Sequence, residues 1–148
     1  MAASNIDGIA EMHDLDEEHQ YSATLNSDSG LFNATKKTEV PTIRLDSFIA
    51  QQNIKQVDLV KIDVETFEPQ VLQGFSESLK IFKPTIIIEI LSDEIGAQVK
   101  SLTHGIGYLY FHIDEEKGLK LVQEITKKDS MNYLLCTERV AVAFGFMS

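Results

Sequence analysis

The segment Val57–Glu68, with the sequence VDLVKIDVETFE, constrains the fold of this chain more than any other. Its first half is a near-continuous run of β-branched and aliphatic residues, which is typical of a parallel strand covered on both faces. Lys61 and Asp63 interrupt this run. Because an unpaired buried charge is costly, these charges either pair with neighbours or lie at the open carboxyl end of the strand. In a doubly wound α/β sheet, ligands bind at that end.

The residues after this strand predict a helix and a second strand. Thr66 and Pro69 indicate a helix start, with a hydroxyl at the cap and a proline in the first turn. Four apolar residues then fall on one helical face, namely Val71, Leu72, Phe75 and Leu79. Thr85–Leu91 (TIIIEIL) is a second apolar run and again contains one acid, Glu89. The alternation predicts an α/β sheet with parallel strands.

The rest of the chain continues this pattern. Ser92 begins a helix that ends near Gly105, a glycine suited to a left-handed terminator. Further strands are expected at Tyr108–Ile113, Leu119–Val122 and Tyr133–Cys136, with Val140–Phe146 a weaker candidate. The last strands are expected to turn antiparallel.

Length and charge bound the class of protein. At 148 residues the chain suits one domain. Its 13 basic and 23 acidic side chains give a net charge of −10, which argues against a nucleic-acid backbone or an anionic membrane as a partner. The N-terminus lacks a signal-peptide profile and no apolar run reaches ~18 residues, so we expect a cytoplasmic protein. The single Cys136 is expected to be a core thiol.

The N-terminal part differs in composition from the rest. Residues 1–30 hold seven acids and no lysine or arginine, and apolar residues are sparse there. We therefore expect residues 1–39 to form an acidic, loop-rich segment and residues 40–148 to form the folded domain.

The charges around the first strand allow two interpretations. Lys61 and Asp63 face the same side of a strand, and Glu65 and Glu68 lie just beyond it at the next helix start. In one interpretation Lys61 pairs with Glu89 on the neighbouring strand, Asp63 or Glu65 caps backbone amides, and nothing reacts. In the other, Asp63 and Glu65 line a ligand crevice, as a general base or as ligands of a hard divalent cation.

Three motifs follow one another along the chain, in Lys61–Glu68 (KIDVETFE), Val71–Gly74 (VLQG) and Pro84–Glu89 (PTIIIE). They resemble the FkbM-type methyltransferase family, whose members share a Lys-Ile-Asp-Val-Glu-Gly-x-Glu signature, a Val-Leu-x-Gly helix and a Pro-x-Ile-x-x-Glu strand. Thr42–Asp46 is similar to an upstream Thr-Leu-Asp segment, and Gly107 with Tyr108 to a Gly-Tyr strand opening. The resemblance extends over roughly residues 40–136.

The resemblance implies a Rossmann-like class I methyltransferase fold. On that basis the strands beginning at Val57 and Thr85 are strands four and five, and those beginning at Tyr108 and Tyr133 are strands six and seven. The chain contains no Asp-x-Gly-x-x-x-Gly loop, and Thr66 stands where the family signature has glycine. We therefore expect the C-terminal portion of such a domain, truncated, with its first three strands missing.

The implied reaction is S-adenosyl-L-methionine-dependent methylation of a hydroxyl on a small sugar or natural-product acceptor. The resemblance makes Asp63 and Glu65 the catalytic candidates, with Lys61, Glu68 and Glu89 in supporting roles. Without the glycine loop, we expect this chain alone to bind S-adenosyl-L-methionine weakly or not at all, and to self-associate or pair with a missing N-terminal half. Two alternatives are a non-catalytic remnant or assembly module, and a metal-dependent hydrolase that uses Asp63, Glu65 and Glu89.

Overall fold

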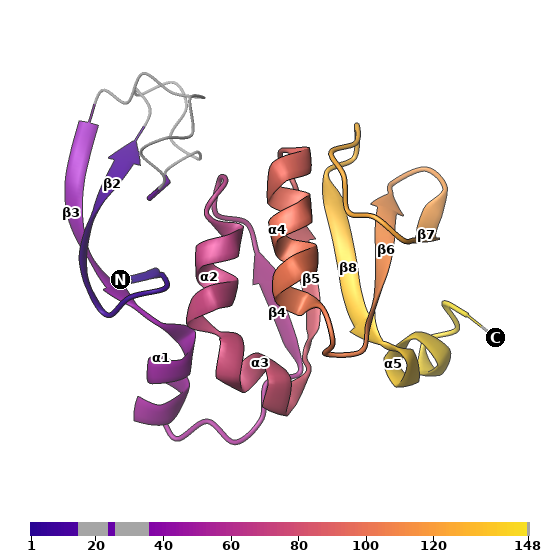
Figure 1. Cartoon of the computed structure of the whole chain (residues 1–148), viewed down its shortest axis with the longest axis horizontal. Helices are drawn as coiled ribbons and strands as arrows, with labels where there is room; N and C mark the ends of the chain where they lie inside the picture. The colour runs from indigo at the N-terminus through magenta and orange to yellow at the C-terminus, as the bar shows by residue number, and fades with distance from the viewer. Residues whose placement is uncertain (15–23, 26–35, 148) are drawn as a thin grey trace.

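The computed structural model describes residues 1–14, 24–25 and 36–147, and its strands form two sheets (Figure 1). The smaller sheet has the order β1-β3-β2, with β1 parallel and β2 antiparallel to β3. The larger sheet has the order β4-β5-β8-β6-β7, in which β4 and β5 are parallel and the other pairs antiparallel. The α/β class expected from the sequence is confirmed.

The strands and helices have the following bounds. The smaller sheet comprises β1 (Ala2–Ala3), β2 (Gly8–Asp14) and β3 (Lys36–Ile43). The larger sheet comprises β4 (Leu59–Ile62), β5 (Thr85–Glu89), β6 (Tyr108–Asp114), β7 (Gly118–Val122) and β8 (Asn132–Thr137). The helices are α1 (Leu45–Gln51), α2 (Glu68–Gly74), α3 (Ser76–Phe82), α4 (Asp93–Thr103) and α5 (Glu138–Ala143).

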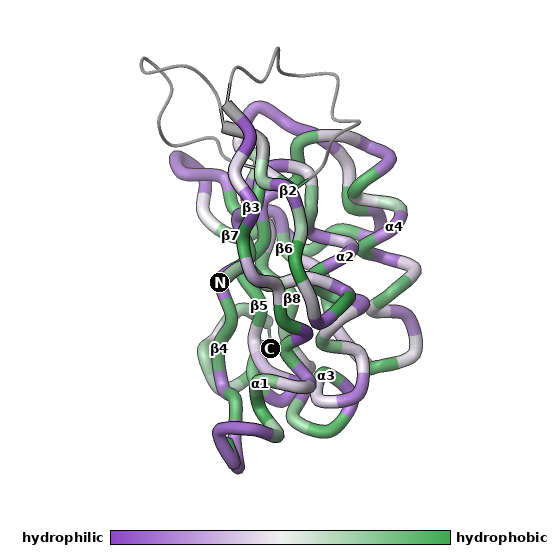
Figure 2. The backbone as a smooth tube through the Cα atoms, turned by 90° about the vertical axis from the view of Figure 1, so that its left-hand side faces the viewer, coloured by the Kyte–Doolittle hydropathy of each residue, from purple (hydrophilic) through white to green (hydrophobic). Residues whose placement is uncertain are grey.

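Helices α2, α3 and α4 lie on one face of the larger sheet, as the edge-on view in Figure 2 shows. The main core lies between these helices and the larger sheet. Side chains alternate along each strand, so successive residues lie on opposite faces of this sheet. In β8, Tyr133 and Leu135 belong to this core, whereas Leu134 and Cys136 belong to a smaller cluster with Ala141 of α5. Cys136 is fully buried, as expected, and burial raises the pKa of its thiol.

Strand β4 is less covered than the sequence predicts. Ile62 is 2% exposed and packs in the main core, but Leu59 is 60% exposed and Lys61 also faces solvent. The reason is position, because β4 is an outer strand of the described sheet and α2–α4 cover only the face that bears Val60 and Ile62. The expectation of a strand buried on both faces is wrong.

Three local predictions also fail. Helix α2 begins at Glu68 after the N-cap residue Phe67, which makes no side-chain capping bond, so Thr66 is not the cap. The apolar face predicted for one helix is divided between α2 and α3, which meet at Phe75. Helix α5 replaces the weaker strand candidate, Val140–Phe146. In contrast, Ser92 caps α4 as predicted, accepting a hydrogen bond from the Ile95 amide at 3.2 Å.

The N-terminal residues are more regular than expected. Strands β1 and β2 lie within residues 1–39, and β3 runs across the division expected at residue 40. Residues 15–23 and 26–35 of that segment lie outside the described residues. The amide of Ser4 donates to the carbonyl of Ile43 at 3.0 Å, which continues the β1–β3 pairing towards α2. Among the described residues, no helix has the length and apolar character needed to cross a membrane.

Candidate acidic site at the carboxyl ends of β4 and β5

The parallel pairing of β4 and β5 brings two acids together. The register sets Leu59 opposite Thr85 and Ile62 opposite Ile88, so the next residues, Asp63 and Glu89, lie side by side. Both follow core residues by one position and therefore belong to the face that α2–α4 leave uncovered. The sequence patterns place each acid at a strand end, and the register makes the two adjacent.

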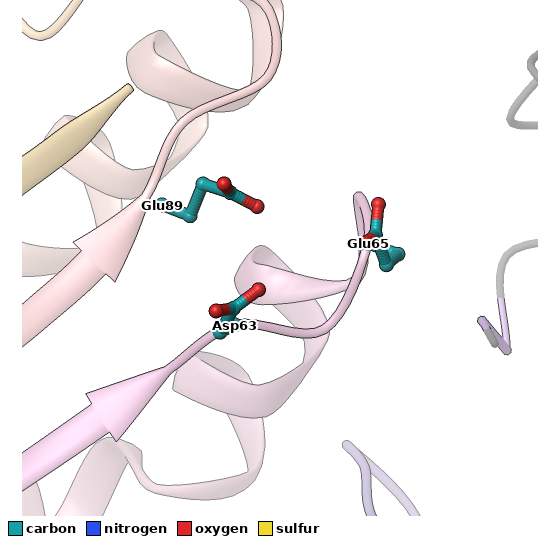
Figure 3. A group of neighbouring side chains, drawn as sticks. All are labelled: Asp63, Glu65 and Glu89. Atoms are coloured by element: carbon teal, nitrogen blue, oxygen red, sulfur yellow. The ribbon is translucent and has the colours of Figure 1, made fainter. Parts of the chain in front are cut away.

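Glu65 completes a cluster of three carboxylates. One carboxylate oxygen from each of Asp63, Glu65 and Glu89 lies within 4.8 Å of the other two, around the space beyond the strand ends (Figure 3). Lys61 Nζ lies 2.9 Å from Asp63 Oδ2. This ion pair differs from the predicted Lys61–Glu89 pairing. Because the two side chains are 46% and 49% exposed, the pair contributes little stability, in the range of about 0–1 kcal/mol.

Glu89 has a raised pKa. Partial burial is the largest cause, followed by the negative charges of Asp63 and Glu65 and a side-chain hydrogen bond with Asp63, while Lys61 acts in the opposite direction. A protonated Glu89 can donate a hydrogen bond to an ionised Asp63, so the pair can share a proton. The site can therefore accept or hold a proton at these carboxyl oxygens.

Glu68 supports the loop beside the cluster rather than joining it. Its side chain is fully buried, and Oε1 accepts a hydrogen bond from the Val64 amide at 3.3 Å, whereas Oε2 has no hydrogen-bond partner among the described residues. Burial raises the pKa of this carboxyl, although nearby backbone amides act to lower it. The supporting role expected for Glu68 thus takes the form of a contact to the backbone between β4 and α2.

That loop carries Glu65 in an uncommon backbone conformation. Glu65 has φ 51° and Thr66 has φ 76°, both in the left-handed region that favours glycine. This explains physically why glycine suits position 66 in the family signature. The hydroxyl of Thr24 donates to the Glu65 carbonyl at 2.7 Å. Sequence reasoning missed Thr24, and no local pattern could have found a contact across 41 residues.

The cluster also has the composition of a hard-cation site, because three carboxylates can supply oxygen ligands. Exposed acidic groups often gather without an ion, and the Lys61 ammonium already neutralises part of this charge. We assign no metal to it. The residues do suit a hydroxyl group, which could donate a hydrogen bond to an ionised carboxylate.

A cavity of about 780 Å³ lies near the same edge of the sheet, beside β6 and β7, and none of the three clustered acids lines it. Its lining includes His112, the β6–β7 turn and residues 128–130, which precede β8. His112 is buried, and its Nε2 lies 2.6 Å from the Ser130 carbonyl oxygen. The cavity holds both lysines and acids, a mixture that indicates no particular ligand.

Comparison with known proteins decides the family. A family model described as "Methyltransferase FkbM domain" matches residues 2–123. The chain belongs to the FkbM methyltransferase family. The FkbM match includes β1–β7 and the three clustered acids, and it begins 38 residues before the position 40 that we expected. It therefore gives no support to the expectation that only a C-terminal portion of the domain is present. Searches of curated proteins and of solved structures find no match.

Proposed function

We propose that this chain takes part in S-adenosyl-L-methionine-dependent methylation of a hydroxyl oxygen on a small molecule, such as a sugar or natural product. The observation that carries the proposal is the convergence of Asp63, Glu65 and Glu89 at the carboxyl ends of adjacent parallel strands. Ligands bind at this end of α/β sheets. Membership of a methyltransferase family supports the reaction type.

In this proposal Asp63 receives the hydrogen bond of the acceptor hydroxyl and takes its proton. A neutral hydroxyl is a weak nucleophile, so a carboxylate that removes its proton as the new C–O bond forms accelerates the transfer. Bound here, S-adenosyl-L-methionine would supply an electrophilic methyl group on its sulfonium, with S-adenosyl-L-homocysteine as the leaving group once the C–S bond is broken. An ionised Glu65 adds negative charge beside Asp63, which favours a nearby cation such as the sulfonium.

The chain's residues fit the cofactor in part. The carboxylates suit the sulfonium and the acceptor, but the sequence holds no Asp-x-Gly-x-x-x-Gly loop for close backbone approach to the nucleoside. We therefore propose that the isolated chain binds S-adenosyl-L-methionine weakly. Titration calorimetry with S-adenosyl-L-methionine should give little heat at micromolar concentrations, and a micromolar Kd would overturn this expectation.

The reaction can be tested directly with methyl-labelled S-adenosyl-L-methionine at saturating concentration. The acceptors would be a panel of monosaccharides, disaccharides and hydroxylated polyketides, with labelled product detected by mass spectrometry. We expect Asp63→Asn to lower transfer by about 10²-fold or more, the range of general-base contributions. Asp58→Asn is the matched control, because Asp58 is exposed and precedes the same strand at its opposite end.

Each result decides the proposal. Loss of transfer in Asp63→Asn with retention in Asp58→Asn supports it. Transfer at the parental rate in Asp63→Asn would remove Asp63 from the mechanism. Absence of labelled product from the whole panel, with parent protein that is folded and saturated with the cofactor, would overturn methylation of this acceptor class by the chain.

A further inference from the structure

The loop that carries Glu65 needs a restraint from elsewhere in the fold. Glu65 and Thr66 are consecutive residues with positive φ, at 51° and 76°. For a β-branched residue such as Thr66, this conformation is a steric outlier, and it persists only where surrounding structure imposes it. Without restraint, the loop would favour negative φ, which would change the position of the Glu65 side chain.

Glu68 and Thr24 each form a hydrogen bond with the backbone of this loop. Glu68 Oε1 accepts from the Val64 amide at 3.3 Å, a contact between residues only four apart. Thr24 approaches from the N-terminal part of the chain, and its Oγ1 donates to the Glu65 carbonyl at 2.7 Å. Thr24 is 2% exposed, so water does not readily replace this hydrogen bond.

We infer that Thr24 is a positioning residue of the acidic site, whose hydroxyl fixes the Glu65 backbone so that the Glu65 carboxylate faces Asp63 and Glu89. This inference rests on the proposed function. Thr24 acts through the Glu65 backbone carbonyl, to which its hydroxyl donates a hydrogen bond. The hydroxyl group of Thr24 makes this contact, because a methyl group cannot donate a hydrogen bond to a carbonyl oxygen.

A purely structural role for Thr24 makes different predictions, and Thr103 provides the comparison. Thr103 is 1% exposed, and its hydroxyl donates to the Val99 carbonyl at 2.8 Å near the end of α4, away from the acids. Thr103→Val removes one buried threonine hydroxyl bonded to a carbonyl, just as Thr24→Val does. Both variants should lose stability, but only Thr24→Val should alter the Glu65 loop.

The test measures the loop and the reaction separately. In the parent, Glu65 should give the strong NMR cross-peak between its own amide and Hα protons that marks a positive φ. We expect Thr24→Val to weaken that cross-peak and to lower kcat about tenfold, the upper range for one hydrogen bond. Thr24→Ser keeps the hydroxyl and should restore both readouts, while Thr103→Val should leave both unchanged.

A second variant tests whether the effect of the Thr24 hydroxyl depends on the steric strain at residue 66. Glycine adopts a positive φ without the steric penalty, so Thr66→Gly should make the loop less dependent on Thr24. The tenfold effect of Thr24→Val should therefore shrink when it is measured in a Thr66→Gly background. An equal effect in both backgrounds would contradict the inference.

The outcomes separate this inference from the function on which it rests. A parent with no transfer activity, but with a Glu65 cross-peak that depends on the Thr24 hydroxyl, would overturn the proposed function and leave the positioning contact established. An unchanged cross-peak and kcat in a folded Thr24→Val variant would overturn the inference. Equal losses of kcat in Thr24→Val and Thr103→Val would reduce Thr24 to a general stabilising residue.

Discussion

The backbone carbonyl oxygen of Ser4 lies 1.9 Å from the point where a Cβ atom on Gly74 would stand. This contact packs the N-terminal strand β1 against the end of α2, and the neighbouring Asn5 Nδ2 donates to Gln73 Oε1 at 3.0 Å. The absence of a side chain at residue 74 is therefore what lets the smaller sheet lie so close to the helix.

Gly74→Ala should destabilise the protein because its new methyl group must push the Ser4 backbone away. We expect a loss of about 1–3 kcal/mol, the usual range for overpacking, in urea unfolding. Gly8→Ala is the control, since nothing lies within 4 Å of a Cβ atom at that position. Equal losses in the two variants would contradict the packing argument.

Leu72→Ala should open a cavity between α2 and the larger sheet. Leu72 is 1% exposed in the main core, so truncation should lower the free energy of unfolding by about 2–5 kcal/mol. Leu121→Ala on β7 removes the same atoms from a side chain that is 47% exposed, and should cost much less. If Leu72→Ala melts at the parental temperature, α2 does not contribute to the core.

Asp63→Asn should lower the pKa of Glu89. The Asp63 charge and its hydrogen bond both raise that pKa, so their removal shifts the Glu89 titration to lower pH, although the effect of burial remains. Carboxyl ¹³C NMR titration of parent and variant measures the shift. Asp58→Asn should leave the Glu89 titration unchanged. An unshifted Glu89 titration in Asp63→Asn would show that Asp63 does not influence the pKa of Glu89.

Glu68→Gln should change how stability depends on pH. Burial raises the pKa of Glu68 in the folded state above its ordinary value of 4.5, so the folded protein retains this proton where the unfolded chain has lost it. Stability from this group is full below about pH 4.5 and declines as pH rises towards the folded pKa. The glutamine side chain of the variant cannot ionise, so the variant should gain stability relative to the parent across that window.

Urea unfolding at a series of pH values measures this trend. Glu77→Gln on α3 controls for the loss of one negative charge, because its side chain is 71% exposed. The difference in free energy of unfolding between parent and Glu68→Gln should change with pH. A difference that stays constant with pH would contradict a raised pKa for the buried Glu68 carboxyl.

Strand β4 should promote self-association. It is an outer strand of the described sheet, and an outer strand offers unpaired backbone groups to another chain. Sedimentation velocity should detect oligomers at high concentration, and Leu59→Lys should reduce them by placing a charge on the exposed β4 side chain. Ile81→Lys, at a 72% exposed position on α3, is the control. A parent that remains monomeric would contradict the prediction.

Much of the larger sheet could be predicted from local patterns. Thr85–Leu91, Tyr108–Ile113 and Tyr133–Cys136 each overlap an observed strand, because runs of β-branched and aromatic residues suit a pleated, buried surface. The strand predicted at Val140–Phe146 is wrong, because a short apolar run does not distinguish a strand from a helix, and the chain forms α5 there. The acidic composition of the first residues likewise concealed β1 and β2, whose pairing depends on β3.

The sequence by itself determined the α/β class, the family signature and the placement of Asp63, Glu65 and Glu89 at or just after the ends of strands, because these follow from local periodicity and motif spacing. Only the tertiary structure decided that Asp63 lies beside Glu89, that Lys61 pairs with Asp63, and that Thr24 holds the Glu65 carbonyl. The physical reason is that strand register, face coverage and a hydrogen bond across 41 residues depend on packing between distant segments.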